Sequence, residues 1–517
     1  MEALKIPLSD SLTIYDCLGA LLSHHRAVYR MKKDEEIFVY LGVDEVNELI
    51  KPLDEVGQAD ISYLRALGKA VKGLLLPNAF VCTLLAGTNS MDLKESYLGS
   101  GVDPCNLRMT RMSEEAIYDM LITDVGISEN YLNNPAFREL LRDIGPVMRP
   151  IGIAISHLEC DFDPRSIANA RSAVQQYLNI RRKGLNKEET KALLGFVLTG
   201  RPADPADPIC SSSKITLDFL QNSGTVHLIP SQDQTVVFMP RIMLESFLAS
   251  TISLGYIGES ARRLLSFVDS HSPDSFEKFA AHFHAMKRAV LLEQCEEGTV
   301  REQSIPIASF FAGALLGEEV VKQEFLLSPL PPSVAFPDGV MWRQGARYPD
   351  SNESAEVTNR LKRHGVILNS KGAAVDVLSC EKIRYIGDLL WRDGITAHAV
   401  KHTITDEELS VDDVAADCDK AVKAIKASTN HCDAQIIILH FSNRRLSPEI
   451  EDVSKWKPEW KRSIIVGENN IEGVVGPMFG RIICSKGFYA IPGSKSYSTL
   501  TKGVSARALG RILHLVR

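Results

Sequence analysis

Two carboxylates follow directly on an apolar run near the start of the chain. Residues 37–43 carry no charged side chain, and Asp44 and Glu45 come immediately after them. An apolar run without polar alternation predicts a strand buried on both faces, as in a parallel sheet. Because ligands of open α/β sheets bind at the carboxyl ends of the strands, Asp44 and Glu45 occupy positions suited to chemistry. The alternative is a buried strand followed by an acidic helix cap, since Asp and Glu are favoured in a first helical turn.

A second apolar run strengthens the interpretation of the first. Residues 79–86 predict another buried strand, which ends in Gly87, Thr88 and Asn89, and residues 61–71 between the two runs have a helical pattern. Together they predict a βαβ unit whose two strands are parallel neighbours. The order of these segments resembles Walker B, helix and sensor 1 of AAA-like and STAND-type NTPases.

This resemblance implies a role for each polar side chain. Asp44 would hold Mg²⁺ through its hydration shell, and Glu45 would polarise the water that attacks a γ-phosphate. Thr88 and Asn89 would face the phosphates of ATP. The predicted nucleotide site therefore requires Asp44 and Thr88 to lie at the same edge of one sheet.

A lid arginine and a phosphate-binding loop would complete such a site. Residues 145–150 have the sequence Gly-Pro-Val-Met-Arg-Pro, which resembles the Gly-x-Pro-Arg turn whose arginine, here Arg149, reaches the nucleotide. A P-loop, Gly-x-x-x-x-Gly-Lys-[Ser/Thr], supplies the backbone N–H groups and the lysine that hold the phosphates. Residues 1–34 contain no match to it. We expect the first strand and the P-loop to be missing from this chain, by truncation or decay.

Asp376 and Lys401 form a second candidate site in the C-terminal part. Residues 372–378 predict a strand carrying Asp376, and residues 395–403 predict another carrying Lys401. A helical pattern precedes them, and a helix and a fully buried strand follow, at residues 354–364, 411–428 and 434–441. This order resembles the PD-(D/E)xK nuclease core, in which the two strands pair. The resemblance implies that Asp376 holds a divalent metal and that Lys401 positions the attacking water.

The chain departs from this nuclease pattern at one position. Two residues before Lys401 stands Ala399, where the pattern has an acidic residue or glutamine. Loss of that ligand weakens metal binding. Glu353 or Glu356, on the preceding helix, could supply the outer carboxylate. The alternative is that Asp376 only caps or pairs on its strand while Lys401 faces solvent.

The middle of the chain predicts helices and a hairpin. Helical patterns at residues 164–179 and 187–198 precede two short strands at 224–229 and 235–239, an order that suggests a winged-helix-like module. Residues 243–327 have mostly helical spacing, and clustered prolines then predict a boundary. The expected organisation is a partial NTPase core and lid (1–150), a winged-helix-like module (151–255), a helical segment (256–328) and a nuclease-like domain (333–517).

Composition limits the class of protein. With 517 residues, the chain has room for about three domains of ~150 residues. A formal net charge of −7 argues against a wholly basic nucleic-acid binder. Ten cysteines occur singly, without a Cys-x-x-Cys pair, which favours reduced thiols in an intracellular protein. The first residues lack a signal-peptide pattern and no run reaches transmembrane length, so no membrane partner is expected.

Taken as a whole, this α/β chain resembles the Crinkler and retrotransposon hot spot (RHS) class, in which an NTPase module precedes a restriction-endonuclease-like domain. The resemblance implies ATP and Mg²⁺ as cofactors, nucleic acid or nuclear proteins as partners, and a nuclear location. If an N-terminal signal has been lost, it also implies an effector secreted into a host cell. The alternative is a catalytically silent scaffold that binds a protein partner, which the missing P-loop and Ala399 both favour.

Overall fold

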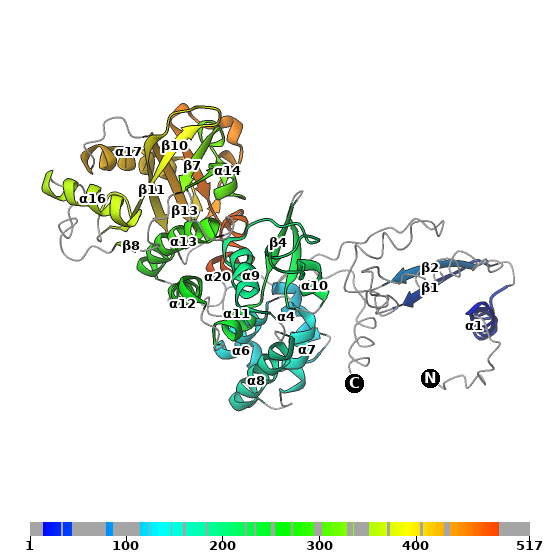
Figure 1. The fold of residues 1–517 in the computed structure, drawn as a ribbon. Coiled ribbons are helices and arrows are strands. Elements are labelled where there is room, and N and C mark those ends of the chain that lie inside the picture. Colours follow the sequence, from blue (N-terminus) through cyan, green and yellow to red (C-terminus); the bar gives the residue numbers. More distant parts are fainter. Residues whose placement is uncertain are drawn as a thin grey trace. The chain divides into compact units, whose positions relative to one another are not determined.

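A computed structural model of the chain divides into two compact units, Met1–Arg111 and Met112–Arg517 (Figure 1). The structure describes residues 14–32, 35–43, 79–85, 114–123, 125–145, 147–158, 162–181, 185–222, 225–231, 234–249, 254–269, 272–293, 302–327, 334–335, 351–369, 373–403, 407–428 and 435–484.

The N-terminal unit contains helix α1 (Ile14–Tyr29) and two strands, β1 (Ile37–Val43) and β2 (Ala79–Leu85). The strands are parallel neighbours, with Val43 in register with Leu85. This confirms the predicted parallel pair. Both strands end at the same level, as a shared site at their carboxyl ends would require. The predicted helix at 61–71 lies outside the described residues.

The first half of the second unit is mainly helical. Antiparallel strands β3 (His227–Ser231) and β4 (Gln234–Phe238) form the predicted hairpin, and Gly145, with a φ of 68°, ends one helix where Phe238 leaves no room for a Cβ atom. The helices are α4 (Glu114–Thr123), α5 (Glu129–Asn133), α6 (Pro135–Ile144), α7 (Met148–Ser156), α8 (Pro164–Arg181), α9 (Lys187–Thr199), α10 (Leu217–Asn222), α11 (Arg241–Leu248), α12 (Gly255–Asp269) and α13 (Pro273–Glu293).

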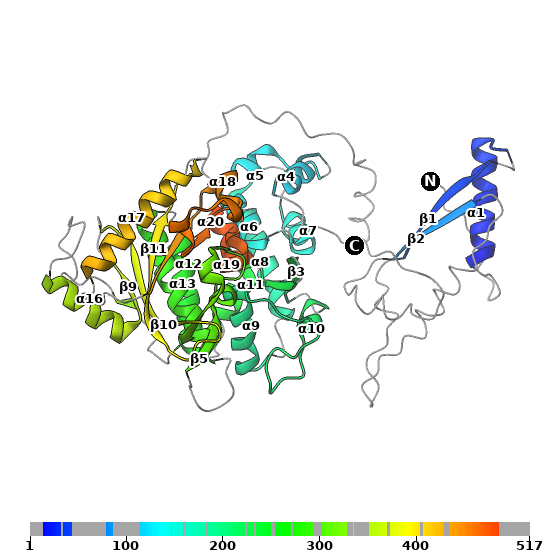
Figure 2. The ribbon, with the colours of Figure 1, turned by 90° about the horizontal axis from the view of Figure 1, so that it is seen from above.

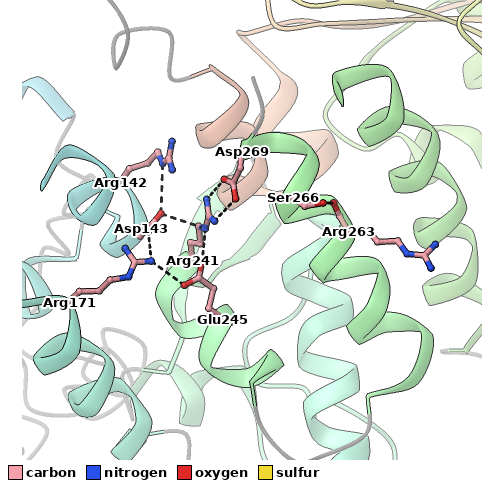
Figure 3. A network of polar contacts seen from close by, with 8 residues as sticks. All are labelled: Arg142, Asp143, Arg171, Arg241, Glu245, Arg263, Ser266 and Asp269. Carbon is pink, nitrogen blue, oxygen red and sulfur yellow. Dashed lines mark hydrogen bonds and ion pairs between the residues drawn. The ribbon is translucent and has the colours of Figure 1, made fainter. Parts of the chain in front are cut away.

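A buried ionic cluster joins four of these helices (Figure 3). Asp143, at the end of α6, is fully buried and lies 2.8 Å from Arg171 of α8 and 3.6 Å from Arg241 of α11. Arg241 also pairs with Asp269 of α12, and it donates a hydrogen bond of 2.9 Å to Glu245. Buried charges are costly unless they are paired, so this cluster fixes how the four helices meet.

The second half of the unit is built on a mixed sheet with the strand order β5-β7-β10-β11-β13-β15-β6, to which β9 adds beside β10 and β8 beside β9. The pairs β11–β13 and β13–β15 are parallel, whereas β10 is antiparallel to its neighbours. The strands are β5 (Gln303–Pro306), β6 (Leu315–Leu316), β7 (Gln323–Leu327), β8 (Val334–Ala335), β9 (Val366–Leu368), β10 (Val377–Tyr385), β11 (Arg392–Lys401), β13 (Gln435–Ser442) and β15 (Ser463–Val466).

Two parts of this sheet differ from the sequence-based expectation. Residues 303–327, which we assigned to a helical segment, supply β5, β6 and β7, so the sheet includes strands from both sides of the proline cluster. In β7 every second side chain is buried, which is the periodicity of a strand. A segment of only five residues is too short for this period to be recognised in the sequence. The strand predicted at residues 395–403 begins earlier, at Arg392, and includes Gly394, where a Cβ atom would collide with Ile383.

Helices cover both faces of the sheet, giving a mixed α/β architecture (Figures 1 and 2). Alternate side chains of β13 show the two faces: Leu439 joins the core that includes α13, and Ile438 joins the core that includes α16 (Ser351–His364) and α17 (Val411–Ser428). The remaining elements are α14 (Ile307–Phe310), α15 (Glu318–Val321), β12 (Glu408–Leu409), β14 (Arg445–Leu446), α18 (Pro448–Glu451), η2 (Val453–Lys455), η3 (Pro458–Trp460), α19 (Ile471–Val475) and α20 (Pro477–Cys484).

Candidate functional site

Asp376 and Lys401 line the same pocket on the α17 side of the sheet. Its volume is about 140 Å³. Small side chains leave this space open, and two acidic and two basic side chains face it. The lining residues are Ala373, Ala374, Asp376, Ala399, Lys401, Asp417 and Lys420.

The pairing of β10 with β11 brings these residues together. The register joins Val377 to His398, which confirms the predicted pairing of the two strands. Just before β10, the Asp376 N–H donates to the His398 carbonyl at 3.2 Å, and the Val400 N–H donates to the Asp376 carboxylate at 2.7 Å. Residues two apart on a strand share a face, so Ala399 and Lys401 lie on the same side of β11. The Asp376 carboxylate is therefore held in place by the strand that carries Lys401.

Asp417 is a third charged member of the pocket, and it was not among the predicted site residues. It lies on α17 with its side chain only 6% exposed, and Lys401 Nζ is 3.4 Å from its Oδ1. Lys420 Nζ lies 3.8 Å from the same oxygen. The other oxygen, Oδ2, is buried and makes no hydrogen bond in the described part of the structure. One sequence signal could have found it: Asp417 falls on the apolar stripe of its helix, between Val414 and Ala421.

His440 connects Asp417 to the sheet. It lies in β13, in register with Ala399 of β11, and its side chain is buried. Nδ1 of His440 is 3.8 Å from Oδ2 of Asp417, and Nε2 is 3.6 Å from the thiol sulfur of Cys418. His440 therefore faces Asp417 with Nδ1 and the Cys418 thiol with Nε2.

The two carboxylates have different electrostatic surroundings. Burial raises the pKa of Asp376 to about 6, against the lowering effects of the Val400 N–H and of Lys401. Burial also raises the pKa of Asp417, but His440, Lys401 and Lys420 outweigh it, and the net pKa lies below the usual value. Near neutral pH both groups are ionised, while in mild acid only Asp417 keeps its charge.

The donor set decides which metal could fit. No group of three or more His, Cys, Asp or Glu side chains is arranged as a metal site among the described residues. Mg²⁺ is commonly bound through one or two carboxylates while it keeps several waters. The pocket offers two carboxylates, and the buried Oδ2 of Asp417 has unused acceptor capacity. These residues suit a hard, partly hydrated cation and do not form a closed structural metal site.

The other predicted site residues are less fully described. Asp44, Glu45, Thr88 and Asn89 lie outside the described residues, immediately or shortly beyond β1 and β2. Arg149 lies in the first turn of α7, and the structure does not describe its side chain. Glu353 and Glu356 lie on α16, and the same holds for their side chains.

No family model, curated protein or solved structure matches this chain. Among the described residues, no helix is both long enough and apolar enough to cross a membrane. The pocket itself is therefore the structural basis for a function of this chain.

Proposed function

We propose that the C-terminal sheet carries a nuclease-like centre that cleaves phosphodiester bonds of nucleic acid with a divalent metal such as Mg²⁺. One observation carries the proposal: Asp376, which directly precedes β10, and Lys401 of the neighbouring strand β11 line one small pocket. Their order along the chain, with the helices and strands around them, resembles the PD-(D/E)xK core. The restriction-endonuclease-like fold is part of the same proposal.

The chain's own residues have separate roles in this proposal. A bound divalent metal would supply charge neutralisation and an acidified water. Asp376 would hold the metal, and the Val400 N–H fixes the orientation of its carboxylate. Lys401 donates a hydrogen bond to the attacking water and stabilises the charge that develops on the phosphate. Lys420 adds a second positive charge at the pocket, which favours a phosphate backbone despite the net charge of −7.

Cleavage assays on the full chain test this function. Supercoiled DNA and a single-stranded RNA, each incubated with Mg²⁺ or Mn²⁺, should be cleaved by the natural chain. Asp376→Asn and Lys401→Met should each lower the rate by about 100-fold or more, since each removes a charge that acts on the reacting groups. The matched control is Lys423→Met. Lys423 is an exposed lysine of α17 that does not line the pocket, so its loss should leave the rate unchanged.

A catalytically silent scaffold is the second candidate. The ion pair between Lys401 and Asp417 favours it, because a lysine bound to a carboxylate can serve a purely structural purpose. Absence of cleavage with both metals and both substrates, or equal rates for the natural chain and Asp376→Asn, would support the scaffold.

We propose that the N-terminal unit is the remnant of an AAA- or STAND-like NTPase. The parallel pair β1–β2 supports this, since Asp44 follows directly on the last residue of β1. Together the two proposals describe a Crinkler- or RHS-like chain that acts on or near nucleic acid in the nucleus, with nuclear proteins as further partners. Fluorescence microscopy of the tagged full chain tests the location, and exclusion from nuclei would contradict it.

A further inference from the structure

Ala399 leaves a gap where the proposed nuclease site lacks its second acidic group. A methyl group at this position faces the pocket beside His440, its partner in register on β13. A longer side chain at residue 399 would extend into the same space. The chain must therefore obtain a second metal-binding carboxylate from another element or do without one.

Helix α17 brings a carboxylate to this space. Asp417 lines the pocket together with Asp376 and Ala399. Its Oδ1 faces Lys401 and Lys420, and its Oδ2 is buried without a hydrogen bond in the described part of the structure. Buried carboxylate oxygens are normally satisfied by hydrogen bonds, and Oδ2 has only the ring nitrogen of His440 at 3.8 Å, so the carboxylate of this pocket-lining residue keeps acceptor capacity for a ligand.

We propose that Asp417 is the second metal-binding carboxylate of this pocket and takes the place of the acidic side chain that residue 399 lacks. The inference rests on the proposed function. Asp376 and Asp417 then hold the cation from opposite walls, one from the sheet and one from the covering helix. His440 is a positioning residue, because its Nδ1, 3.8 Å from Oδ2, limits the orientations open to the carboxylate.

Binding of Mn²⁺ to the full chain, measured by calorimetry, tests this assignment without any cleavage assay. Asp417→Asn should weaken binding by about 10-fold to 100-fold, as should Asp376→Asn. Asp419→Asn is the control, because Asp419 is exposed two residues further along the same helix and does not line the pocket. It should bind Mn²⁺ like the natural chain.

Moving the carboxylate back to the strand gives a sharper test. The double variant Ala399→Asp with Asp417→Ala should recover at least about tenfold of the affinity that Asp417→Ala alone has lost. A merely structural Asp417 would show no such recovery. Circular dichroism and thermal unfolding of each variant establish that it is folded, and Asp417→Ser replaces any Asn or Ala variant that is not.

The outcomes separate the two proposals. If Asp376→Asn loses Mn²⁺ binding and Asp417→Asn keeps it, the assignment of Asp417 is overturned while the proposed nuclease function stands. If Asp417→Asn loses Mn²⁺ binding but the natural chain cleaves neither DNA nor RNA, the metal site stands and the nuclease function is overturned. A natural chain that binds no Mn²⁺ at millimolar concentration overturns the assignment outright.

Discussion

Asp376 and Asp417 lie in one pocket, yet they respond differently to acid. Burial is the main influence on Asp376 and raises its pKa to about 6, whereas His440 and two lysines keep Asp417 ionised to lower pH. A proton on Asp376 competes with a cation for the same oxygen atoms. Protonation of this one residue therefore controls the proposed site between pH 5 and pH 7.

The first residue-scale prediction concerns the pH dependence of Mn²⁺ binding. Below pH 6 the affinity should rise by nearly tenfold per pH unit as Asp376 loses its proton, and above about pH 7 it should level off. Calorimetry from pH 4.5 to 8 measures this curve. Asp376→Asn should remove the rise, and a natural chain with a flat curve over this range would contradict the prediction.

A second prediction concerns the stability cost of the same carboxylate. Its pKa is 3.8 unfolded and about 6 folded, so the contribution of Asp376 to stability is most favourable below pH 3.8, falls as pH rises through this window and is constant above it. The asparagine side chain in Asp376→Asn does not ionise, so this variant should raise the free energy of unfolding at pH 7.5 by up to about 3 kcal/mol. The gain should shrink towards zero near pH 4. Urea denaturation at several pH values measures it, and Lys423→Met serves as a control without a gain.

At the scale of helices and strands, some of the contacts that position the pocket residues can be predicted from the sequence and others cannot. The parallel pair β1–β2, the hairpin β3–β4 and the pairing of β10 with β11 were predicted, because each follows from apolar runs and turns within about 50 residues of sequence. Strands β5 to β7 were missed, since all three are short and since β6 and β7 also pair with strands far along the chain, β15 and β10. Asp417 was missed for a related reason: its role appears only when α17 packs against β11 and β13.

The ionic cluster around Asp143 gives a prediction at the scale of helix packing. Arg241→Met leaves a fully buried carboxylate with fewer cations and releases Asp269, so the free energy of unfolding should fall by about 3 kcal/mol. Arg263→Met is the control, because Arg263 is 58% exposed and directed away from Asp143 (Figure 3). It should change stability by less than about 0.5 kcal/mol. Equal urea midpoints for the two variants would mean that the cluster contributes nothing.

At the scale of the whole molecule, the two proposed sites differ in the groups available to bind a ligand, and the proposed ATP site has fewer of them. Most affinity of a P-loop NTPase for ATP comes from backbone N–H groups and a lysine, and the sequence has no Gly-x-x-x-x-Gly-Lys-[Ser/Thr] segment. Asp44 and Glu45 without them place two carboxylates near a polyanion, an arrangement that repels ATP unless Mg²⁺ intervenes.

The chain should therefore not bind ATP with micromolar affinity, which corresponds to about −8 kcal/mol. Glu45→Gln should leave binding and turnover unchanged, because the residue has no positioned phosphate on which to act. Calorimetry with Mg-ATP on the full chain is the measurement. Micromolar binding would show that an unrecognised phosphate-binding segment is present.

The position of residues 303–327 in the sheet has a consequence for how the chain is made. This segment supplies β7 at one side of the sheet and β6 at the other, where β6 pairs with β15. Strand β15 leaves the ribosome about 140 residues after β7, which at ~5–20 residues per second takes about 7–28 seconds. During that interval β6 has no partner strand, whereas β7 can pair with β5 as soon as it is made and with β10 before β15 emerges. Unpaired apolar strand edges are prone to aggregate. Successful production of this protein should therefore depend on chaperones that bind the nascent chain until β15 has emerged.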